Sequence, residues 1–501
     1  MIKYINIFKK KNNLKCSKTA LKETILICDR GRPAQIFFSS LFAYNINKNK
    51  KYNVFVLSDK KVSTEYNKHF YKTFNIDSFY LLNLKNINLI LLKSFFESIY
   101  QLFKINFKNF DNFAENFKHK SIYCGDLVWD TYIRHDHSFL NPTINLKFFK
   151  IIFITIYKIN FLDNFIKKKN VKMILSSANN YSSLSGISLR IGLKYKIKTY
   201  YQKFHKVVKI KRFSDIRKSP FILSKNELLD KYKFKDNFIF TKYFENRMNA
   251  KNLPKRSTKN IIDVISAFQN KINDEKYFFK KIKKNRNNFK NICVFAPHAF
   301  SDCNHAYGKL IYRDYFQNFV ETLKIIKNNK ENLWIVKPHP SSYIFNEVGI
   351  VEKYLKKFTQ NNLVICPSNI STKLILRIAD KIVTSRGTIG LESACIGKKA
   401  IITGSSPYSH LGLSLNPKNK EIYKKMLKST KKEKKLNNNK QILAKKYLYW
   451  FAMDRVYDKL NFIQIDRNKK NSFMKNLIKL QKTPQFTSKI LSYMKYLNKL
   501  V

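Results

Sequence analysis

Residues 381–404, KIVTSRGTIGLESACIGKKAIITG, decide the fold of this chain. An apolar strand at 381–384 runs into the small, polar turn Ser385-Arg386-Gly387, a short helix follows at 388–396, and another strand lies at 400–403. A strand, a tight turn and a helix that leads to a second strand form the repeating unit of a parallel sheet. The stretch therefore predicts an α/β domain in this half of the chain.

The same turn has the chemistry of an anion site. Four of the 11 glycines of the chain lie in this stretch, and a glycine lets the backbone approach a ligand closely. The exposed N–H groups at the helix start, from Thr388 onward, would bind a phosphate, and Glu392 would reach a ribose hydroxyl one turn later. A plain strand-to-helix corner without a ligand is the alternative, because such corners are common in α/β folds.

Polar residues also follow two other strands of this half. The predicted strands are Ile292–Phe295, Leu333–Val336, Leu363–Ile365, Lys381–Thr384 and Ala400–Thr403. His298 and Asp302 follow the first of them, and Lys337 and His339 follow the second. Because the carboxyl ends of parallel strands meet at one edge, these loops would gather a Lys, a His and a helix start around a diphosphate. Taken singly, each His after a strand is more often a structural hydrogen-bonding residue.

The first half reads as a second α/β domain. A strand at 24–28 leads into a loop that contains Arg30 and Arg32, and an apolar helix and another strand follow. Further on, the stretch GDLVWDTYIR begins directly after a short strand and contains Asp126 and Asp130. Strands that alternate with helices predict a mostly parallel sheet here too.

These patterns predict four segments. They are an N-terminal Rossmann-like acceptor domain at 1–225, a helical connector at 226–290, a C-terminal Rossmann-like donor domain at 291–430, and a helical tail at 431–501 that packs back on the N-terminal domain. The predicted fold class is thus α/β, with two Rossmann-like domains that face a cleft and with C-terminal helices.

Composition points to a folded protein with anionic partners. The chain has 501 residues, 44% of them hydrophobic and 15% aromatic, which suits a protein with two large cores. The formal net charge is +64, with Lys far more frequent than Arg. Asn, Ile, Phe and Tyr are abundant as well, and this bias is what an A/T-rich coding sequence would produce. Such a charge favours lipid headgroups, nucleic acid or acidic sugar polymers.

The sequence predicts a cytoplasmic protein at the inner face of a membrane. The apolar runs at 87–103 and 148–165 are interrupted by charges, so neither is expected to span a bilayer, and the N-terminus lacks the apolar core of a signal peptide. Seven scattered Cys without a CxxC pair suggest reduced thiols. The Lys-rich surface would press the protein against anionic lipid.

Residues 291–404 resemble the donor domain of bacterial GT-B glycosyltransferases that build surface polysaccharide. The resemblance is to the capsule-biosynthesis transferases, including Kdo transferases, to the bacterial sialyl- and polysialyltransferases, and more loosely to the CDP-glycerol glycerophosphotransferases. It rests on the His339-Pro340 pair after a strand and on the small-residue turn from Ser385 to Glu392. The stretches DRGRP and GDLVWDTYIR resemble the acceptor side of the same proteins.

The resemblance implies roles for these residues. It implies that His339, Ser385 and Thr388 hold the phosphates of the donor nucleotide and that Glu392 holds its ribose. Lys337, Arg386 and Gly387 lie beside them and would contribute to donor binding, and Arg30 and Arg32 would lie on the acceptor side. The substrate would be a nucleotide sugar, with a CMP-linked sugar favoured. The acceptor would be a growing surface glycan such as capsule, O-antigen or a lipid-linked oligosaccharide.

Glycosyl transfer needs a base for the acceptor hydroxyl and a group that stabilises the departing phosphate. Asp126 and Asp130 are the main candidates for the base, Asp29 is a weaker one, and His298 and Asp302 complete the predicted catalytic set. An Asp after a Gly is, however, often a helix cap. We expect no metal and no cofactor, and the stretch His135-Asp136-His137 is better explained as a solvated loop.

Two other functions remain open from sequence. A nucleotide-sugar 2-epimerase shares the GT-B architecture and would work without an acceptor. A non-catalytic basic protein that binds membranes or nucleic acid would explain the charge, but the charge is spread along the chain and no nucleic-acid motif is visible, so we expect no specific nucleic-acid partner.

Overall fold

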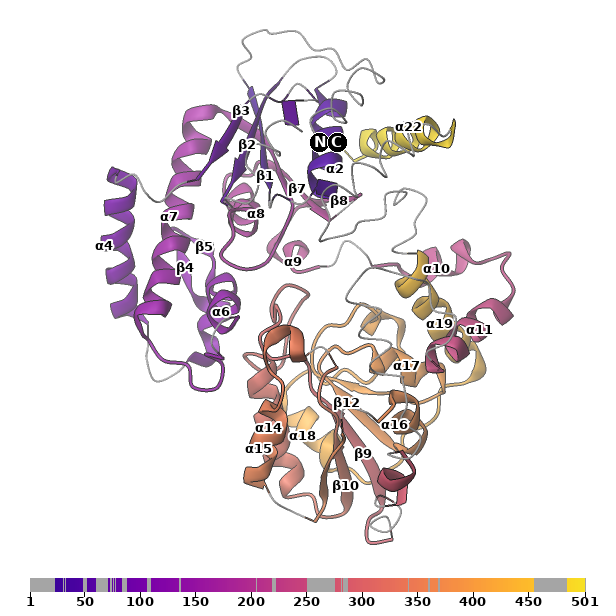
Figure 1. The fold of residues 1–501 in the computed structure, drawn as a ribbon. Coiled ribbons are helices and arrows are strands. Elements are labelled where there is room, and N and C mark those ends of the chain that lie inside the picture. Colours follow the sequence, from indigo (N-terminus) through magenta and orange to yellow (C-terminus); the bar gives the residue numbers. More distant parts are fainter. Residues whose placement is uncertain are drawn as a thin grey trace. The chain divides into compact units, whose positions relative to one another are not determined.

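The chain divides into two compact units, and each is described by itself (Figure 1). Unit 1 comprises 1–132, 142–220 and 457–501, and unit 2 comprises 133–141 and 221–456. The computed structural model describes residues 23–29, 31, 33–47, 52–59, 71–72, 74, 76, 78–82, 88–105, 110–134, 137–203, 205–218, 222–249, 275–280, 282, 287–340, 342–358, 361–367, 370–454 and 484–500.

Unit 1 is built on a six-stranded sheet in the order β3-β2-β1-β6-β7-β8. The strands are β1 (Glu23–Asp29), β2 (Tyr52–Ser58), β3 (Ser78–Leu81), β6 (Val171–Ser176), β7 (Lys198–Lys203) and β8 (Lys206–Ile210). All neighbours are parallel except β7 and β8, which form an antiparallel pair. A separate two-stranded sheet pairs β4 (Lys118–His119) with β5 (Ile122–Tyr123).

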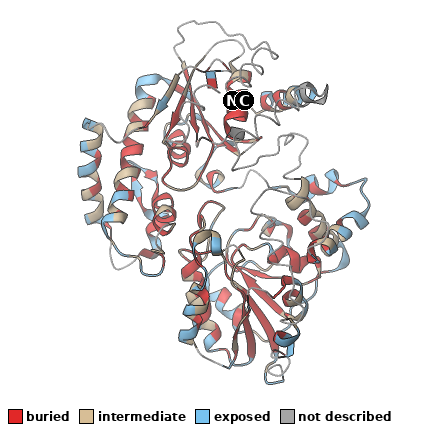
Figure 2. Cartoon of the chain, viewed as in Figure 1, coloured by how far each residue is buried: buried red, intermediate tan, exposed pale blue. Residues whose placement is uncertain are grey.

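Some helices of unit 1 pack on this sheet, and others pack on those helices. The helices of this unit are α2 (Pro33–Ile46), α4 (Leu89–Lys104), the 3₁₀ turn Phe110–Asn112, α5 (Phe113–Asn116), α6 (Gly125–Ile133), α7 (Leu146–Lys169), α8 (Leu184–Lys194), α9 (Phe213–Ile216) and α22 (Pro484–Asn498). Helix α22, from the C-terminal end, packs on α2: Tyr493 and Leu497 are buried in the cluster that includes Phe37 and Phe38. The near-continuous apolar strand β1 is buried on both faces, as expected for a covered parallel sheet (Figure 2).

Unit 2 is built on a five-stranded, wholly parallel sheet in the order β11-β10-β9-β12-β13. The strands are β9 (Asn291–Ala296), β10 (Asn332–Val336), β11 (Leu363–Ile365), β12 (Lys381–Thr384) and β13 (Ile401–Ile402). Its helices are α10 (Lys225–Lys231), α11 (Asn237–Met248), α14 (Tyr315–Lys327), α15 (Ile350–Leu355), α16 (Thr372–Ile378), α17 (Ile389–Cys395), α18 (Lys420–Lys428) and α19 (Asn438–Tyr449). Short 3₁₀ turns at Ser342–Phe345, Lys356–Phe358 and Ser409–Leu411 and a π-helical turn at Trp450–Asp454 complete the unit.

These two sheets confirm the predicted α/β class, with parallel sheets in two domains and helices toward the C-terminus. The domain boundaries differ from those predicted. Residues 133–141 lie in unit 2 because the ring of Phe139 packs on Phe300 and Phe316, with ring centroids 5.4 and 5.0 Å apart. Of the predicted connector, the described helices α10 and α11 belong to unit 2, where α11 packs on α19. The predicted tail is divided, since α19 belongs to unit 2 and α22 to unit 1.

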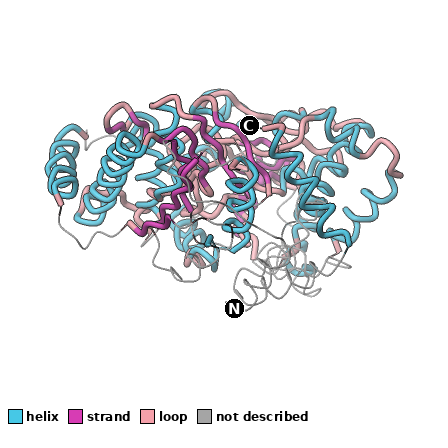
Figure 3. The backbone as a smooth tube through the Cα atoms, turned by 90° about the horizontal axis from the view of Figure 1, so that it is seen from above, coloured by secondary structure: helices cyan, strands magenta, loops and turns pink. Residues whose placement is uncertain are grey.

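The two apolar runs of the first half form helices α4 and α7, which lie side by side in Figures 1 and 3. Helix α7 begins at the N-cap Asn145 and ends at Asn170, which adopts a left-handed conformation (φ 44°). Within the described ranges, neither these helices nor any other has the length and the continuous apolar character that crossing a bilayer requires.

Candidate functional site

The site predicted in the second half lies where the strand order of unit 2 reverses. The chain runs from β9 outward to β10 and β11, and then returns to β12 on the other side of β9. The loops after β9 and β12 therefore leave the sheet in opposite directions, and open α/β sheets bind ligands at the carboxyl ends of such strands. His298 and Asp302 lie in the loop after β9, and the turn Ser385–Thr388 follows β12.

Ring stacking and a hydrogen bond through Tyr315 of α14 link the three predicted loops at this edge. Strand pairing aligns Phe295 with Val336 and Ala296 with Thr384, so β9, β10 and β12 end together. The ring of His298 stacks on His339, with centroids 5.0 Å apart, and on Tyr315, with centroids 4.4 Å apart. Arg386 Nη1 donates to the Tyr315 hydroxyl over 3.0 Å. His339 and the 385–388 turn therefore lie at the same edge of the sheet.

The two stacked imidazoles are neutral near pH 7. Loss of hydration within the loops, together with the neighbouring His298, lowers the pKa of His339 to about 3, although Asp302 acts in the opposite direction. Loss of hydration also lowers the pKa of His298, although the carboxylate of Asp302 acts in the opposite direction. Both rings are half-buried, and His298 Nδ1 lies 3.4 Å from the carbonyl of Ala299, which leaves Nε2 of this ring as its acceptor nitrogen.

Glu347 holds the loop that carries His298 and Asp302. Its buried carboxylate accepts hydrogen bonds from the amides of Phe300 (2.8 Å) and Ser301 (2.7 Å) and from the Ser301 hydroxyl (2.6 Å). Burial raises the pKa of Glu347, while these bonds oppose the shift. Glu347 was not predicted from sequence, because no local pattern connects it to a loop 46 positions earlier.

Arg386, in the turn after β12, makes hydrogen bonds to the loop at 304–309. Nη1 donates to the carbonyl of Asn304 (2.6 Å), and Nη2 donates to the carbonyls of Gly308 (2.6 Å) and Lys309 (3.3 Å). The side chain is buried, with 8% of its surface exposed. Its guanidinium therefore shapes the loop at 304–309.

Three further predicted donor-site side chains contact protein groups. The Ser385 hydroxyl donates to Asn318 Oδ1 (2.7 Å), and Lys337 Nζ donates to the carbonyl of Ile370 (2.7 Å). Glu392 Oε1 accepts from Arg247 Nε (2.9 Å) and Nη2 (2.6 Å). All three are buried, whereas Thr388 is exposed and Gly387 is half-buried.

The glycines of this corner make room for protein atoms. A Cβ on Gly387 would lie 2.8 Å from Thr384 Oγ1, and a Cβ on Gly390 would collide with the Tyr408 hydroxyl. That hydroxyl donates to the Gly387 carbonyl over 2.6 Å. Close packing of α17 against Tyr408 therefore explains the Gly at position 390.

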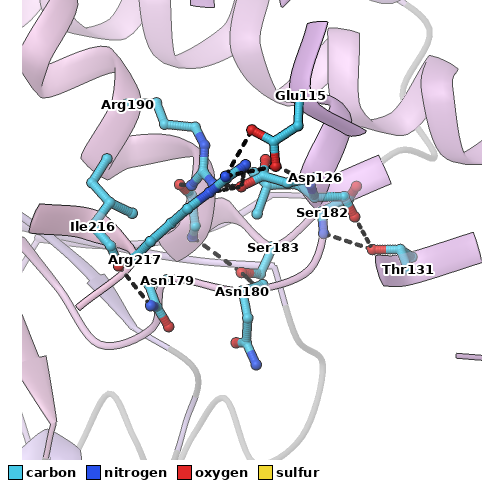
Figure 4. Close-up of polar contacts among 12 residues, drawn as sticks. Glu115, Asp126, Thr131, Asn179, Asn180, Ser182, Ser183, Arg190, Ile216 and Arg217 are labelled. Atoms are coloured by element: carbon cyan, nitrogen blue, oxygen red, sulfur yellow. Dashed lines mark hydrogen bonds and ion pairs between the residues drawn. The ribbon is translucent and has the colours of Figure 1, made fainter. Parts of the chain in front are cut away.

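Asp126 lies in a buried charge cluster of unit 1 (Figure 4). Its Oδ2 accepts from Arg190 Nη2 (2.7 Å) and from Arg217 Nη2 (3.1 Å) and Nε (3.2 Å). Arg217 Nη1 also donates to both carboxylate oxygens of Glu115, over 2.8 and 2.9 Å. Asp126 therefore joins α6 to α8 and to the residue that follows α9.

The other first-half candidates are buried or lie outside the described residues. Asp130 is 2% exposed, and Asp29 is fully buried with its Oδ2 accepting from the Gly31 amide over 3.0 Å. The loop after β6 is held close to these elements, because Asn179 donates to the Ile216 carbonyl and the Ser182 amide donates to Thr131 (Figure 4). The predicted acceptor-side residues Arg30 and Arg32, and His135 and Asp136, lie outside the described residues.

No group of three or more His, Cys, Asp or Glu side chains in the described part of the chain could hold a metal ion.

A family model described as "Capsule polysaccharide biosynthesis protein" matches residues 184–450, more than half of the chain. The chain belongs to the capsule polysaccharide biosynthesis family. The match contains the three loops of unit 2 described above, together with α8, β7, β8 and α9 of unit 1. A comparison with curated proteins found no match.

Solved structures similar to this capsule biosynthesis protein include two kinds of transferase and an epimerase. The beta Kdo 2,7 transferase KpsC of Thermosulfurimonas dismutans is 18% identical; the alignment covers 57% of this chain and 79% of that one, with a TM-score of 0.30. A glycosyltransferase from Rickettsia africae is 11% identical over 96% and 100% of the chains (TM-score 0.24). The UDP-GlcNAc 2-epimerase of Methanocaldococcus jannaschii, in complex with UDP-GlcNAc and UDP, is 12% identical over 86% and 100% (TM-score 0.24).

Proposed function

We propose that this capsule biosynthesis protein is a glycosyltransferase that moves a sugar from a nucleotide-sugar donor to a growing bacterial surface glycan. The observation that carries the proposal is the meeting of His298, His339 and the 385–388 turn at the point where the strand order of unit 2 reverses. Ligands of open α/β sheets bind at such points. A CMP-linked sugar is the favoured donor, and capsule, O-antigen or lipooligosaccharide is the acceptor class.

In this proposal the donor phosphate binds between the imidazoles and the turn. The N–H group of neutral His339 and the exposed Thr388 hydroxyl would donate to its oxygens. Lys337, Ser385, Arg386 and Glu392 would act indirectly, since their side chains hold the surrounding loops in place. The leaving phosphate would be stabilised by N–H and O–H donors, so we expect turnover to persist in the presence of EDTA.

We assign the base to His298. Its half-buried ring is neutral, and the negative charge of Asp302 favours the imidazolium that would form when the ring takes the proton of an acceptor hydroxyl. Asp126 and Asp130 are weaker candidates, because both carboxylates are buried and Asp126 accepts from two arginines.

We also place the reaction at the anionic cytoplasmic face of the inner membrane, because a formal net charge of +64 attracts anionic lipid. The protein is not expected to recognise a specific nucleic acid.

A thermal-shift panel of CMP, CDP, UDP and GDP tests the donor assignment, since a nucleotide that binds only the native state raises the melting temperature. We expect one of them, CMP first, to stabilise the protein. His339→Ala should weaken that nucleotide about tenfold or more, as loss of a hydrogen bond to a charged group does. His410→Ala, which changes an exposed ring that contacts the Leu223 carbonyl, is the matched control.

Two results would contradict the proposal: no stabilisation by any nucleotide, or equal affinity in wild type and His339→Ala. Conversion of a nucleotide sugar in the absence of an acceptor would instead indicate an epimerase.

A further inference from the structure

Helix α4 presents an apolar face to the outside of unit 1. Five large apolar side chains on one side of this 16-residue helix are exposed: Leu89 (84%), Leu92 (48%), Phe96 (67%), Tyr100 (57%) and Phe103 (80%). Its fully buried residues are instead Ser94 and Ser98. An ordinary surface helix has the reverse arrangement, with apolar residues inside and polar residues outside. Exposed apolar patches of this kind mark interaction surfaces.

Specific polar contacts fix α4 in this orientation. Asn160 Nδ2, on α7, donates to Ser94 Oγ (2.8 Å) and to Glu97 Oε2 (2.6 Å). His119 Nε2, on β4, lies 3.4 Å from the same Glu97 oxygen. The ring of Phe95 adds an apolar contact to α7, with centroids 5.7 Å from Phe149 and 6.0 Å from Phe153. Rotation of the helix to bury its apolar face would break this hydrogen-bonded network.

The charge around this face has one sign. Lys93 and Lys104 are exposed on α4, while Glu97, the one acidic residue of the helix, is directed inward to Asn160 and His119. Lys118 and Lys120 are exposed on the β4–β5 hairpin that contacts α4 through His119. An apolar face flanked by lysines, with its acidic group turned away, complements an anionic lipid surface.

We propose that α4 lies in the interface of an anionic lipid bilayer, with Leu92, Phe96 and Phe103 in the acyl boundary and the lysines at the headgroups. The inference rests on the membrane location in the proposed function and names the surface responsible. A lipid occupant is favoured over a second copy of the chain, because two such faces would bring their lysines together in a protein of formal net charge +64. Helix α4 lies along the outer side of α7 within unit 1, as Figures 1 and 3 show.

Co-sedimentation of the 501-residue protein with vesicles tests this surface. One vesicle type contains phosphatidylcholine alone, and the other also contains phosphatidylglycerol. We expect binding to the anionic vesicles and a loss of about tenfold or more in partitioning for the triple variant Leu92→Gln, Phe96→Gln and Phe103→Gln. Lys93→Gln with Lys104→Gln should weaken binding and its salt dependence.

The matched control replaces three exposed aromatic residues of unit 2, Phe234→Gln, Phe238→Gln and Tyr277→Gln, and should bind vesicles as wild type does. Nucleotide thermal shifts of all variants separate this inference from the donor assignment, because α4 variants should bind the nucleotide normally. The proposal is overturned if the α4 triple variant binds vesicles like wild type, or if neutral vesicles bind equally well. It is also overturned if sedimentation velocity shows a lipid-free dimer that the triple substitution dissociates.

Discussion

At the residue scale, Glu347 holds the loop after β9, which carries His298 and Asp302 of the proposed nucleotide site. Its buried carboxylate accepts three hydrogen bonds from this loop: from the amides of Phe300 and Ser301 and from the Ser301 hydroxyl. In Glu347→Gln one carboxylate oxygen becomes an NH₂ group, which cannot accept a hydrogen bond and would face an N–H or O–H group of the loop. We expect the nucleotide affinity to fall about tenfold and the free energy of unfolding to fall by about 1–3 kcal/mol. Titration calorimetry and urea unfolding measure the two effects.

Glu331→Gln provides the control, because that exposed carboxylate pairs with Lys290 at the surface and should matter little to either quantity. Unchanged nucleotide affinity in Glu347→Gln would show that the loop does not take part in donor binding.

The depressed pKa of His339 predicts a pH dependence of stability. Its pKa is about 3 in the folded protein and near 6.5 in the unfolded chain, so the unfolded state binds more protons between these values. The contribution of neutral His339 to the free energy of unfolding is therefore complete above pH 6.5, and it is lost as the pH falls toward 3. Relative to His339→Asn, which lacks the titration, wild type should lose about 1 kcal/mol between pH 7 and pH 5.5. Urea unfolding of both proteins at the two pH values measures this difference. An equal loss of unfolding free energy in wild type and His339→Asn would show that the pKa of His339 is not lowered.

At the element scale, the corner between β12 and α17 depends on Arg386. Its two terminal nitrogens reach three carbonyls of the 304–309 loop and the Tyr315 hydroxyl. A Lys keeps the charge but cannot reproduce this planar fork. We expect Arg386→Lys to lower the free energy of unfolding by about 3 kcal/mol, through two or three lost hydrogen bonds in a buried place. Urea unfolding measures it.

The exposed Arg377 at the end of α16 offers a comparison, and Arg377→Lys should change stability by less than about 0.5 kcal/mol. Equal stabilities of the two variants would mean that the loop at 304–309 does not need the guanidinium.

At the scale of the whole molecule, the C-terminal helix α22 completes the core of unit 1. Tyr493 is buried against Phe38, with ring centroids 5.2 Å apart, and Asn45 donates to Asn498 Oδ1 over 2.6 Å. Tyr493→Ala should destabilise unit 1 by about 3–5 kcal/mol and leave the unfolding of unit 2 unchanged. Scanning calorimetry should show this as one lowered transition.

Leu491→Ala changes an exposed side chain of the same helix and should leave both transitions in place. A shift of both transitions by Tyr493→Ala would show that the two units unfold as one.

The strands of the second half were predicted closely, and the reason is local. The predicted strands at 333–336, 363–365 and 381–384 coincide with β10, β11 and β12 to within a residue, because short apolar runs bounded by turn residues specify buried parallel strands. The antiparallel pairing of β7 with β8 was not predicted, because the residue pattern of these short strands does not distinguish antiparallel from parallel pairing. Nor could the outward apolar face of α4 be predicted, because it depends on Asn160 and His119, which are distant in sequence.

The sequence alone determined the α/β class, the positions of the strand ends and the resemblance to capsule biosynthesis proteins. All three follow from residue patterns within short stretches, which periodicity and turn chemistry govern. Only the tertiary structure decided which polar groups near the strand ends are engaged in supporting the fold. The hydrogen-bond partner of Lys337 is 33 positions away in the chain, that of Ser385 is 67 positions away, and that of Glu392 is 145 positions away. A hydrogen bond between residues so far apart depends on the packing of the whole domain, whereas a strand or a turn depends mainly on its neighbours in sequence.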